Sequence, residues 1–284
     1  MTPIRLREAM AETLAGWEAD LPEAWRAALG PIGDAFDAVD GDLDFELWEP
    51  IFPVRRGRHF PGQPSGAHAL HAFDGIAPDG VRCVILGQDP YPEPGFATGR
   101  AFEAGNLASW SELDKMFSKS VRAYMQLIAA ARTGDESLCE SFDRWPDVRG
   151  LLTASNSSFE GPGDIADRWV REGVLLLNAS LTLSRFRVDI DPHQSRGHMP
   201  FWRPLMLRVI ETMLARGEPL VFIGFGAAAA EIFATSGLTE GTSGHVALIL
   251  REHPAFADKV LGLPNPFNLC NSHLEAMGVR PIAW

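Results

Sequence analysis

The chain has few cysteines, which argues against three kinds of site that depend on them. Cys83, Cys139 and Cys270 lie far apart among the 284 residues, and none belongs to a C-x-x-C pair. An odd and widely spaced set argues against a disulfide framework and against a zinc ribbon. It also supplies too few thiolates for the usual four-cysteine iron–sulfur cluster. We expect all three cysteines to be reduced and structural.

Long apolar runs are also missing. None reaches the roughly 18–20 residues that a membrane-spanning helix needs. The opening stretch, MTPIRLREAMAETL, lacks the apolar segment and small-residue cleavage site of a secretory signal. Repeats, low-complexity tracts and a clear linker are absent as well. These absences predict a cytoplasmic protein with no membrane partner, and the length is sufficient for one large domain with a buried core.

Positive charge is scarce, which argues against a nucleic-acid partner, because proteins that bind DNA neutralise its phosphates with Lys and Arg. The formal net charge is −12 at pH 7. Residues 1–50 hold twelve Asp or Glu against three Lys or Arg, a local net charge of −9. Subtracting that −9 from −12 leaves −3 for the other 234 residues, so the remainder can still carry a basic groove. An acidic enzyme with a small-molecule substrate is the alternative.

The acidic N-terminal region has the apolar spacing of a buried helix. Between residues 8 and 29, apolar side chains recur at helical intervals, and Gly30-Pro31 supplies a stop. The members of this pattern are Met10, Leu14, Trp17, Leu21, Trp25 and Leu29. We therefore divide the chain into an acidic helical N-terminal extension, residues 1–50, packed on a main domain, residues 51–284. The extension is interpreted as a packing cap. The alternatives are a docking surface or, in a chain that binds DNA, a device that tunes DNA affinity.

Short apolar runs alternate with helical stretches in the main domain. Four runs have the length of a buried strand: Val81–Leu86, Val174–Leu177, Pro219–Ile223 and Val246–Leu250. The helical stretches among them include Ser111–Ala131, Pro200–Ala215 and Ala227–Ala234. Such alternation is typical of a parallel sheet with helices on its faces. The predicted fold class is α/β: a single three-layer domain whose central, mostly parallel, four-stranded sheet is flanked by helices.

Polar side chains follow three of the four strand-like runs. Asp89 comes shortly after the first run, Asn178 directly after the second, and His253 shortly after the fourth. Each has an ordinary explanation when taken alone: a turn aspartate, an Asx turn and a structural histidine. In open α/β sheets, however, ligands bind outside the carboxyl ends of the strands. The shared placement of these residues at one sheet edge predicts an active site.

Three segments around these residues resemble the signature segments of an enzyme family. They are GQDPYP at 87–92, GVLLLNASLTL at 173–183 and HPAF at 253–256. They are similar to the uracil-DNA glycosylases of the main bacterial and eukaryotic type (family 1-like), and the similarity extends from about Phe52 to the C-terminus. The resemblance implies that residues 51–284 form the catalytic domain of a monomeric DNA-repair hydrolase. Such an enzyme releases free uracil from single- or double-stranded DNA, leaves an abasic site, and needs no metal or other cofactor.

The resemblance implies catalytic roles for two residues. Asp89 matches the aspartate that positions and activates the hydrolytic water, and His253 matches the histidine that hydrogen-bonds uracil O2. Cleavage of the N-glycosidic bond develops positive charge on the sugar and negative charge on the departing uracil. A fixed carboxylate stabilises the first charge and a fixed donor stabilises the second, as an oxyanion hole would. The base must first leave the stack, because its reacting bond cannot be reached inside a duplex.

The resemblance also implies residues that bind the base and the DNA. The backbone of Gln88 helps to shape the site, and Tyr91 crowds C5 of the base and so excludes the methyl group of thymine. Phe102 matches the phenylalanine that stacks on uracil, and Asn178 matches the amide that reads the O4 and N3 edge. Ser120 matches a serine that grips phosphate, on a looser alignment.

The sequence departs from the family pattern beside Tyr91 and after His253. Pro92 stands where the family usually has histidine, which either forms a rigid turn or removes a hydrogen bond that helps to position water. After the histidine the family continues Pro-Ser-Pro-Leu-Ser, and its leucine wedges into the duplex in place of the flipped base. Here the run at 254–258 is Pro-Ala-Phe-Ala-Asp.

The altered loop leaves the identity of the wedge open. By count the wedge position is Ala257, which is too small. Phe256, Leu261 or Leu263 is the candidate replacement, since apolar side chains can unstack a base step, and core packing is the alternative for Phe256. We expect Pro254 and Phe256 to contact DNA. Loss of the serine hydroxyls predicts weaker phosphate binding and poorer cleavage of duplex than of single-stranded uracil, which needs little unpairing.

Two other functions compete with uracil removal. One keeps the fold and changes the substrate, to another damaged base, a free nucleoside or mainly single-stranded DNA. The other is a non-catalytic homologue that binds DNA or protein, which is expected to lack the carboxylate or the histidine. Because Asp89 and His253 are both present, the sequence favours catalysis.

Overall fold

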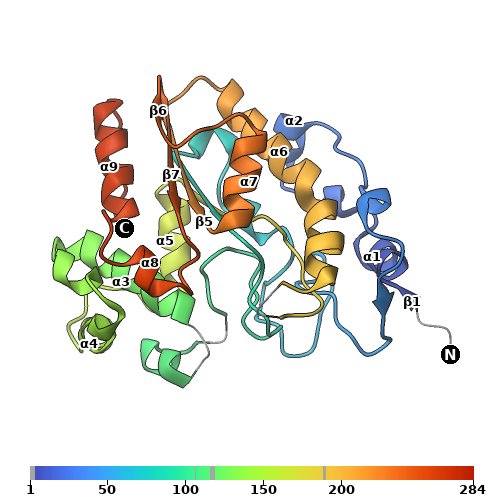
Figure 1. Ribbon diagram of the computed structural model, residues 1–284, viewed down its shortest axis with the longest axis horizontal. Coiled ribbons are helices and arrows are strands. Elements are labelled where there is room, and N and C mark those ends of the chain that lie inside the picture. The colour runs from blue at the N-terminus through green and yellow to red at the C-terminus, as the bar shows by residue number, and fades with distance from the viewer. Residues whose placement is uncertain (1–3, 106, 116–118, 188–189) are drawn as a thin grey trace.

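A central sheet covered by helices on both faces organises the computed structural model, which describes residues 4–105, 107–115, 119–187 and 190–284 (Figure 1). The sheet has five strands in the order β4-β3-β5-β7-β6. Their bounds are β3 Cys83–Gly87, β4 Val174–Asn178, β5 Leu220–Phe225, β6 Gly241–Ser243 and β7 Val246–Arg251. Neighbouring strands are parallel except β6, which runs antiparallel to β7. A separate antiparallel pair joins β1 (Ile4–Arg5) to β2 (Asp44–Phe45).

The helices form the outer two layers of the α/β fold (Figure 1). One face of the sheet is covered by α3 (Lys119–Thr133), α4 (Trp145–Thr153), α5 (Ile165–Arg171) and α9 (Pro266–Ala276). The other face is covered by α1 (Leu6–Leu14), α2 (Glu23–Leu29), α6 (Met199–Ala215) and α7 (Ala227–Thr235). The short α8 (Ala257–Val260) follows β7. No helix in the described ranges is long and apolar enough to span a bilayer.

Short turns of 3-10 helix connect these elements. They are η1 Trp17–Asp20, η2 Phe36–Ala38, η3 His71–Phe73, η4 Pro78–Gly80, η5 Trp110–Lys115, η6 Glu136–Cys139 and η7 Phe142–Arg144, and a π-helical turn, η8 Gln194–His198, precedes α6.

Alternate residues of each strand feed two hydrophobic cores, one on each face. On β3, Cys83 and Ile85 join the core beneath α3, α5 and α9, whereas Val84 and Leu86 join the core beneath α6 and α7. Successive side chains of a strand point to opposite faces, and here both faces are covered. The strands therefore appear in the sequence as continuous apolar runs. All three cysteines are buried and free.

The predicted α/β class and its four strands are confirmed, and the sheet gains a fifth strand. Strand β6 consists of Gly-Thr-Ser and is fully exposed, so no apolar pattern marked it. The predicted helix over Ser111–Ala131 begins later, because η5 comes first and α3 starts at Lys119.

One continuous helix over residues 8–29 is wrong. Helix α1 ends at Leu14, the chain then turns at Gly16 with φ of 72°, and α2 begins only at Glu23. The six apolar residues of the pattern are nevertheless buried. They lie on the side of α6, where Trp17 packs edge-on against Trp202 with ring centroids 5.1 Å apart. The six apolar residues keep helical spacing because they all face the core beneath α6, although the segment is not one continuous helix.

Candidate active site

One cavity of about 240 Å³ at the carboxyl edge of the sheet is lined by residues at or just after the ends of three parallel strands. Asp89 follows β3, Asn178 is the last residue of β4, and His253 follows β7. In the sheet, β4 and β5 lie on opposite sides of β3, so the strand order reverses there. Such a reversal is where open α/β sheets bind ligands. The structure therefore brings together the three polar residues that the sequence placed at strand ends.

The parallel register of β3 and β4 sets Asn178 beside Gly87. These two residues are paired in the ladder, and the pairing continues past the strands, with Ala179 N donating to Gly87 O at 2.9 Å and Ser180 N to Gln88 O at 3.0 Å. A Cβ atom at position 87 would lie 2.6 Å from Asn178 Oδ1. Glycine thus leaves the space that the buried amide occupies.

The Asp89 carboxyl group is only partly accessible and has one side-chain hydrogen-bond partner within the described structure. Gln88 Nε2 donates to Asp89 Oδ2 at 3.2 Å. Burial raises the pKa of Asp89 to about 6, against the smaller lowering effect of the Gln88 contact. A carboxylate with a pKa near 6 is ionised at neutral pH and is a stronger base than an exposed aspartate. This group can orient water and stabilise a nearby cation.

The His253 ring is held as a neutral hydrogen-bond donor. Burial lowers the pKa of His253, so the ring is neutral at pH 7. The backbone N–H of Ala255 donates to His253 Nδ1 at 3.2 Å, which assigns the ring proton to Nε2. A neutral imidazole that donates from Nε2 can stabilise an oxygen on which negative charge develops.

An aromatic cluster forms the apolar wall of the cavity. Phe102 lines the cavity and stacks on Tyr124 with centroids 4.3 Å apart and planes 5° from parallel, while Phe225 contacts its edge. Its backbone adopts φ of 60°, a strained conformation for a non-glycine residue that often marks functional sites. Tyr91 also lines the cavity, and burial raises its phenol pKa. The wall therefore offers a flat face for a planar ring.

The remaining residues predicted from the sequence divide into two groups. Ser120 and Pro92 line the cavity, whereas Pro254 is buried outside it. Phe256 does not line the cavity and is 56 % exposed, with Lys259 Nζ 5.3 Å from its ring centroid. Of the other wedge candidates, Leu263 is 47 % exposed, and Leu261 and Ala257 are buried.

Three parts of the cavity lining were not predicted from the sequence. The segment 97–100, Lys119 and Phe186 all line it. Phe186 lies in the loop after β4 and is 53 % exposed, so it places an aromatic ring at the cavity mouth. The positions of these residues depend on the conformations of the loops near the sheet edge. The spacing of residues in the sequence does not determine those conformations.

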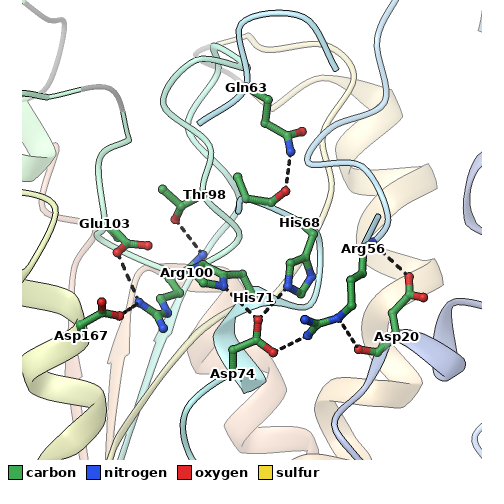
Figure 2. Close-up of polar contacts among 11 residues, drawn as sticks. Asp20, Arg56, Gln63, His68, His71, Asp74, Thr98, Arg100, Glu103 and Asp167 are labelled. Atoms are coloured by element: carbon green, nitrogen blue, oxygen red, sulfur yellow. Dashed lines mark hydrogen bonds and ion pairs between the residues drawn. The ribbon is translucent and has the colours of Figure 1, made fainter. Parts of the chain in front are cut away.

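Polar contacts of Arg100 connect segment 97–100 to Glu103 and Asp167 (Figure 2). Arg100 Nη1 pairs with Asp167 Oδ1 at 2.6 Å and with Glu103 Oε1 at 3.4 Å, and its backbone N–H donates to Thr98 Oγ1 at 3.1 Å. Figure 2 also shows a cluster of His68, His71 and Asp74 beside this segment. Among the described residues, that cluster is the set of donors able to hold a metal ion, and it lies outside the cavity lining.

Sequence comparison finds bacterial relatives along nearly the whole chain. The uracil-DNA glycosylase of Parafrankia sp. (strain EAN1pec) is 30% identical over 266 residues, which cover 93% of this chain and 95% of the relative. Uracil-DNA glycosylase 1 of Streptomyces avermitilis is 30% identical over 93% of this chain and 96% of its own length. The Mycobacterium tuberculosis H37Rv uracil-DNA glycosylase is 29% identical over 92% and 93%. No family model matches the chain.

Solved structures share the fold. The UNG structure from Nitratifractor salsuginis aligns with a TM-score of 0.59 at 21% identity, over 98% of this chain and 99% of that one. Mimivirus uracil-DNA glycosylase aligns with a TM-score of 0.61 at 16% identity, over 100% and 94%.

Proposed function

Because the chain belongs to the uracil-DNA glycosylase family, we propose that the cavity at its sheet edge binds and releases uracil. The protein is a hydrolase of DNA repair that cleaves the N-glycosidic bond between uracil and deoxyribose. The observation that carries the assignment of the site is the convergence of Asp89, Asn178 and His253 on one cavity. We place the protein with the family 1-like enzymes, on the strength of the segments at 87–92, 173–183 and 253–256.

Each of the three polar residues is assigned a different role in the reaction. Asn178 offers one amide donor and one acceptor, which suit uracil O4 and N3–H; cytosine presents the opposite pattern at that edge. Asp89 holds water and stabilises positive charge on the sugar, while His253 Nε2–H stabilises negative charge at uracil O2. Water adds to the sugar carbon, the bond to uracil breaks, and the products are free uracil and an abasic site.

A panel of bases tests this assignment. Matched oligonucleotides with uracil, thymine, cytosine or another damaged base at one position should yield abasic sites from uracil alone, in single strands and in duplexes. Release of a different damaged base with uracil untouched would overturn the assigned specificity and favour a relative with another substrate. A folded protein that binds DNA and releases no base would favour the non-catalytic alternative.

Uracil release is expected to fall as the pH drops through about 6, because Asp89 acts as a carboxylate and burial raises its pKa to about 6. Protonation removes the active form, so about a tenth of the maximal rate should remain one unit below the pKa. The measurement is single-turnover cleavage from pH 4.5 to 8, with DNA affinity followed at each pH. A flat profile across this range, with affinity unchanged, would contradict the assigned role.

Replacement Tyr91→Ala is expected to give measurable release of thymine. The ring lines the cavity, and its removal opens space for a methyl group at C5 of the base. Tyr91→Phe keeps the ring and is the matched control, for which thymine should stay uncleaved. Thymine release should be assayed on single strands, where little unpairing is needed. No release by Tyr91→Ala, with uracil still cleaved, would assign thymine exclusion to another residue.

We propose Phe256 as the side chain that enters the duplex, supported by its 56 % exposure next to the cavity-lining Ala255. Phe256→Ala is expected to lower kcat/KM on duplex uracil about tenfold, as lost stacking of about 1–3 kcal/mol implies. Cleavage of single strands should change little. Leu263→Ala, also exposed, is the matched comparison. Equal losses of kcat/KM on both substrates would show that Phe256 is not the residue that enters the duplex. A larger loss on duplex DNA in Leu263→Ala would assign that role to Leu263.

Residues 1–50 are proposed to act as a packing cap, and the region is supported in that role by its buried apolar face against α6. The alignment with the Parafrankia enzyme leaves 7% of this chain outside, about 20 of 284 residues. Most of the region therefore has a counterpart in that relative. We further propose a monomer that works in the cytoplasm on single- and double-stranded DNA, with single strands preferred.

A further inference from the structure

Three side chains with metal-binding donors, from His68, His71 and Asp74, converge beside segment 97–100 of the cavity lining (Figure 2). His68 Nε2 lies 2.8 Å from Asp74 Oδ2, and His71 Nδ1 lies 3.2 Å from the same oxygen. All three donor atoms fall within 4.8 Å of one another. None of the three residues lines the uracil cavity, so the reaction does not account for the cluster.

The local backbone brings these side chains to one face. His71 N donates to His68 O at 3.0 Å, and Asp74 N donates to His71 O at 3.1 Å, which makes two successive turns of 3-10 type around η3. Residues three apart eclipse each other in such turns. The H-x-x-H-x-x-D spacing therefore aligns the two imidazoles and the carboxylate before any ion binds.

The carboxylate of Asp74 is fixed from its far side. Arg56 Nη2 contacts Asp74 Oδ1, while Arg56 Nε donates to Asp20 O at 3.1 Å and its backbone N–H to Asp20 Oδ2 at 3.2 Å. Oδ1 is thus occupied and Oδ2 faces the imidazoles. Carboxylates that bind metals are usually held in this way by an outer partner.

We propose that His68, His71 and Asp74 bind a zinc ion through Nε2, Nδ1 and Oδ2, with water as the fourth ligand. Two imidazoles and a carboxylate form a nitrogen–oxygen set that suits Zn²⁺. Ligand atoms at about 2.0–2.1 Å from a tetrahedral zinc stand about 3.3 Å apart. The two imidazole–carboxylate separations of 2.8 and 3.2 Å need to widen by up to about half an ångström. The two imidazole nitrogens, which lie within 4.8 Å of each other, need to approach to about the same 3.3 Å.

The cluster is open to solvent on one side. The side chains of His71 and Asp74 are 22% and 25% exposed, whereas that of His68 is 5% exposed. His71 also lines a second cavity of about 320 Å³. An ion therefore has a path to the donors, and a water molecule has room to complete the coordination.

The proposed site braces the wall of the uracil cavity. His68 N donates to Thr98 O at 3.2 Å, and a Cβ atom at Gly99 would lie 1.9 Å from His68 O. The turn that holds the ion thus packs directly on segment 97–100, with no space for a side chain between them. Zinc should stiffen this wall without contacting the reacting atoms. The site is therefore tested by zinc affinity and by the thermal stability of the protein.

Titration of the intact, chelator-treated protein with zinc sulfate tests the site by calorimetry and by thermal melting. We expect one bound equivalent with micromolar or tighter Kd, and a Tm that rises by several degrees in excess zinc. His71→Gln and Asp74→Asn, which keep side-chain size, should each weaken binding at least tenfold. His59→Ala, at an exposed histidine of the preceding loop, should bind as the wild type does.

Cobalt replaces zinc in a second measurement that needs no variant. The visible spectrum of the wild-type protein with one equivalent of Co²⁺ should show the intense bands of four-coordinate cobalt. Absence of saturable zinc binding to the wild type at about 100 μM would overturn the proposal, as would a six-coordinate cobalt spectrum. Binding unchanged in both folded variants would also overturn it.

Discussion

Asp89→Asn is expected to lower kcat for uracil release by about 10²- to 10⁴-fold, the range that a positioned acid–base group contributes. Asparagine keeps the shape of the side chain and removes its negative charge. The variant can no longer accept a proton from water or stabilise the positive charge that develops on the sugar. The measurement is single-turnover release of uracil at pH 8, where the wild-type group is ionised because its pKa is about 6.

The same substitution should leave the fold at least as stable. Burial raises the pKa of Asp89 above the ordinary aspartate value, so the ionised form is disfavoured in the folded protein. That cost appears as the pH rises from the unfolded pKa, about 4, through about 6, and remains above it. Asparagine removes it, and the Tm at pH 8 should equal or exceed that of the wild type. A wild-type rate in the folded variant would contradict the role of Asp89.

His253→Ala is expected to lower kcat by about 10²- to 10³-fold, the usual loss when one donor to a developing oxyanion is removed. The expectation follows from the Ala255 N–H, which donates to Nδ1 and leaves the proton on Nε2. Partial burial lowers the pKa of His253, so the neutral ring contributes a directed hydrogen bond and no full charge.

Substrate affinity separates this role from simple positioning of the loop. Affinity for DNA that contains uracil should fall much less than kcat, because the bond strengthens as charge develops. His253→Gln, which retains an N–H donor, should recover part of the rate. Equal losses in kcat and affinity, with no recovery by glutamine, would show that the histidine supports the loop and does not act on the departing base.

The sheet and the polar centre of the site were predictable because simple periodicities encode them. A strand buried on both faces is expected to be apolar along its length, and Val174–Asn178 is an example whose last residue, Asn178, lines the cavity. Parallel strands deliver their carboxyl ends to one edge, so Asp89, Asn178 and His253 had to lie near one another.

Features that depend on contacts between distant segments of the chain were not predictable. The break at Gly16 preserves the apolar spacing of a helix, so the sequence pattern does not reveal it. Phe186 reaches the cavity through a loop, and the contact of the turn at His68 with Thr98 joins segments 30 residues apart. Strand β6 has no apolar residue by which to recognise it. In each case a tertiary contact determines the conformation, and the spacing of apolar residues along the sequence does not reveal that contact.

The most direct test of the central claim is a count of products from one defined substrate. Purified protein is incubated in EDTA with a single-stranded oligonucleotide that carries one uracil, and both free uracil and abasic sites are quantified. The roles proposed for Asp89, Asn178 and His253 involve no metal ion, so both products should form in EDTA. One free uracil is expected per abasic site, because hydrolysis of one N-glycosidic bond yields one of each. Absence of both products, from protein shown to be folded, would contradict the account.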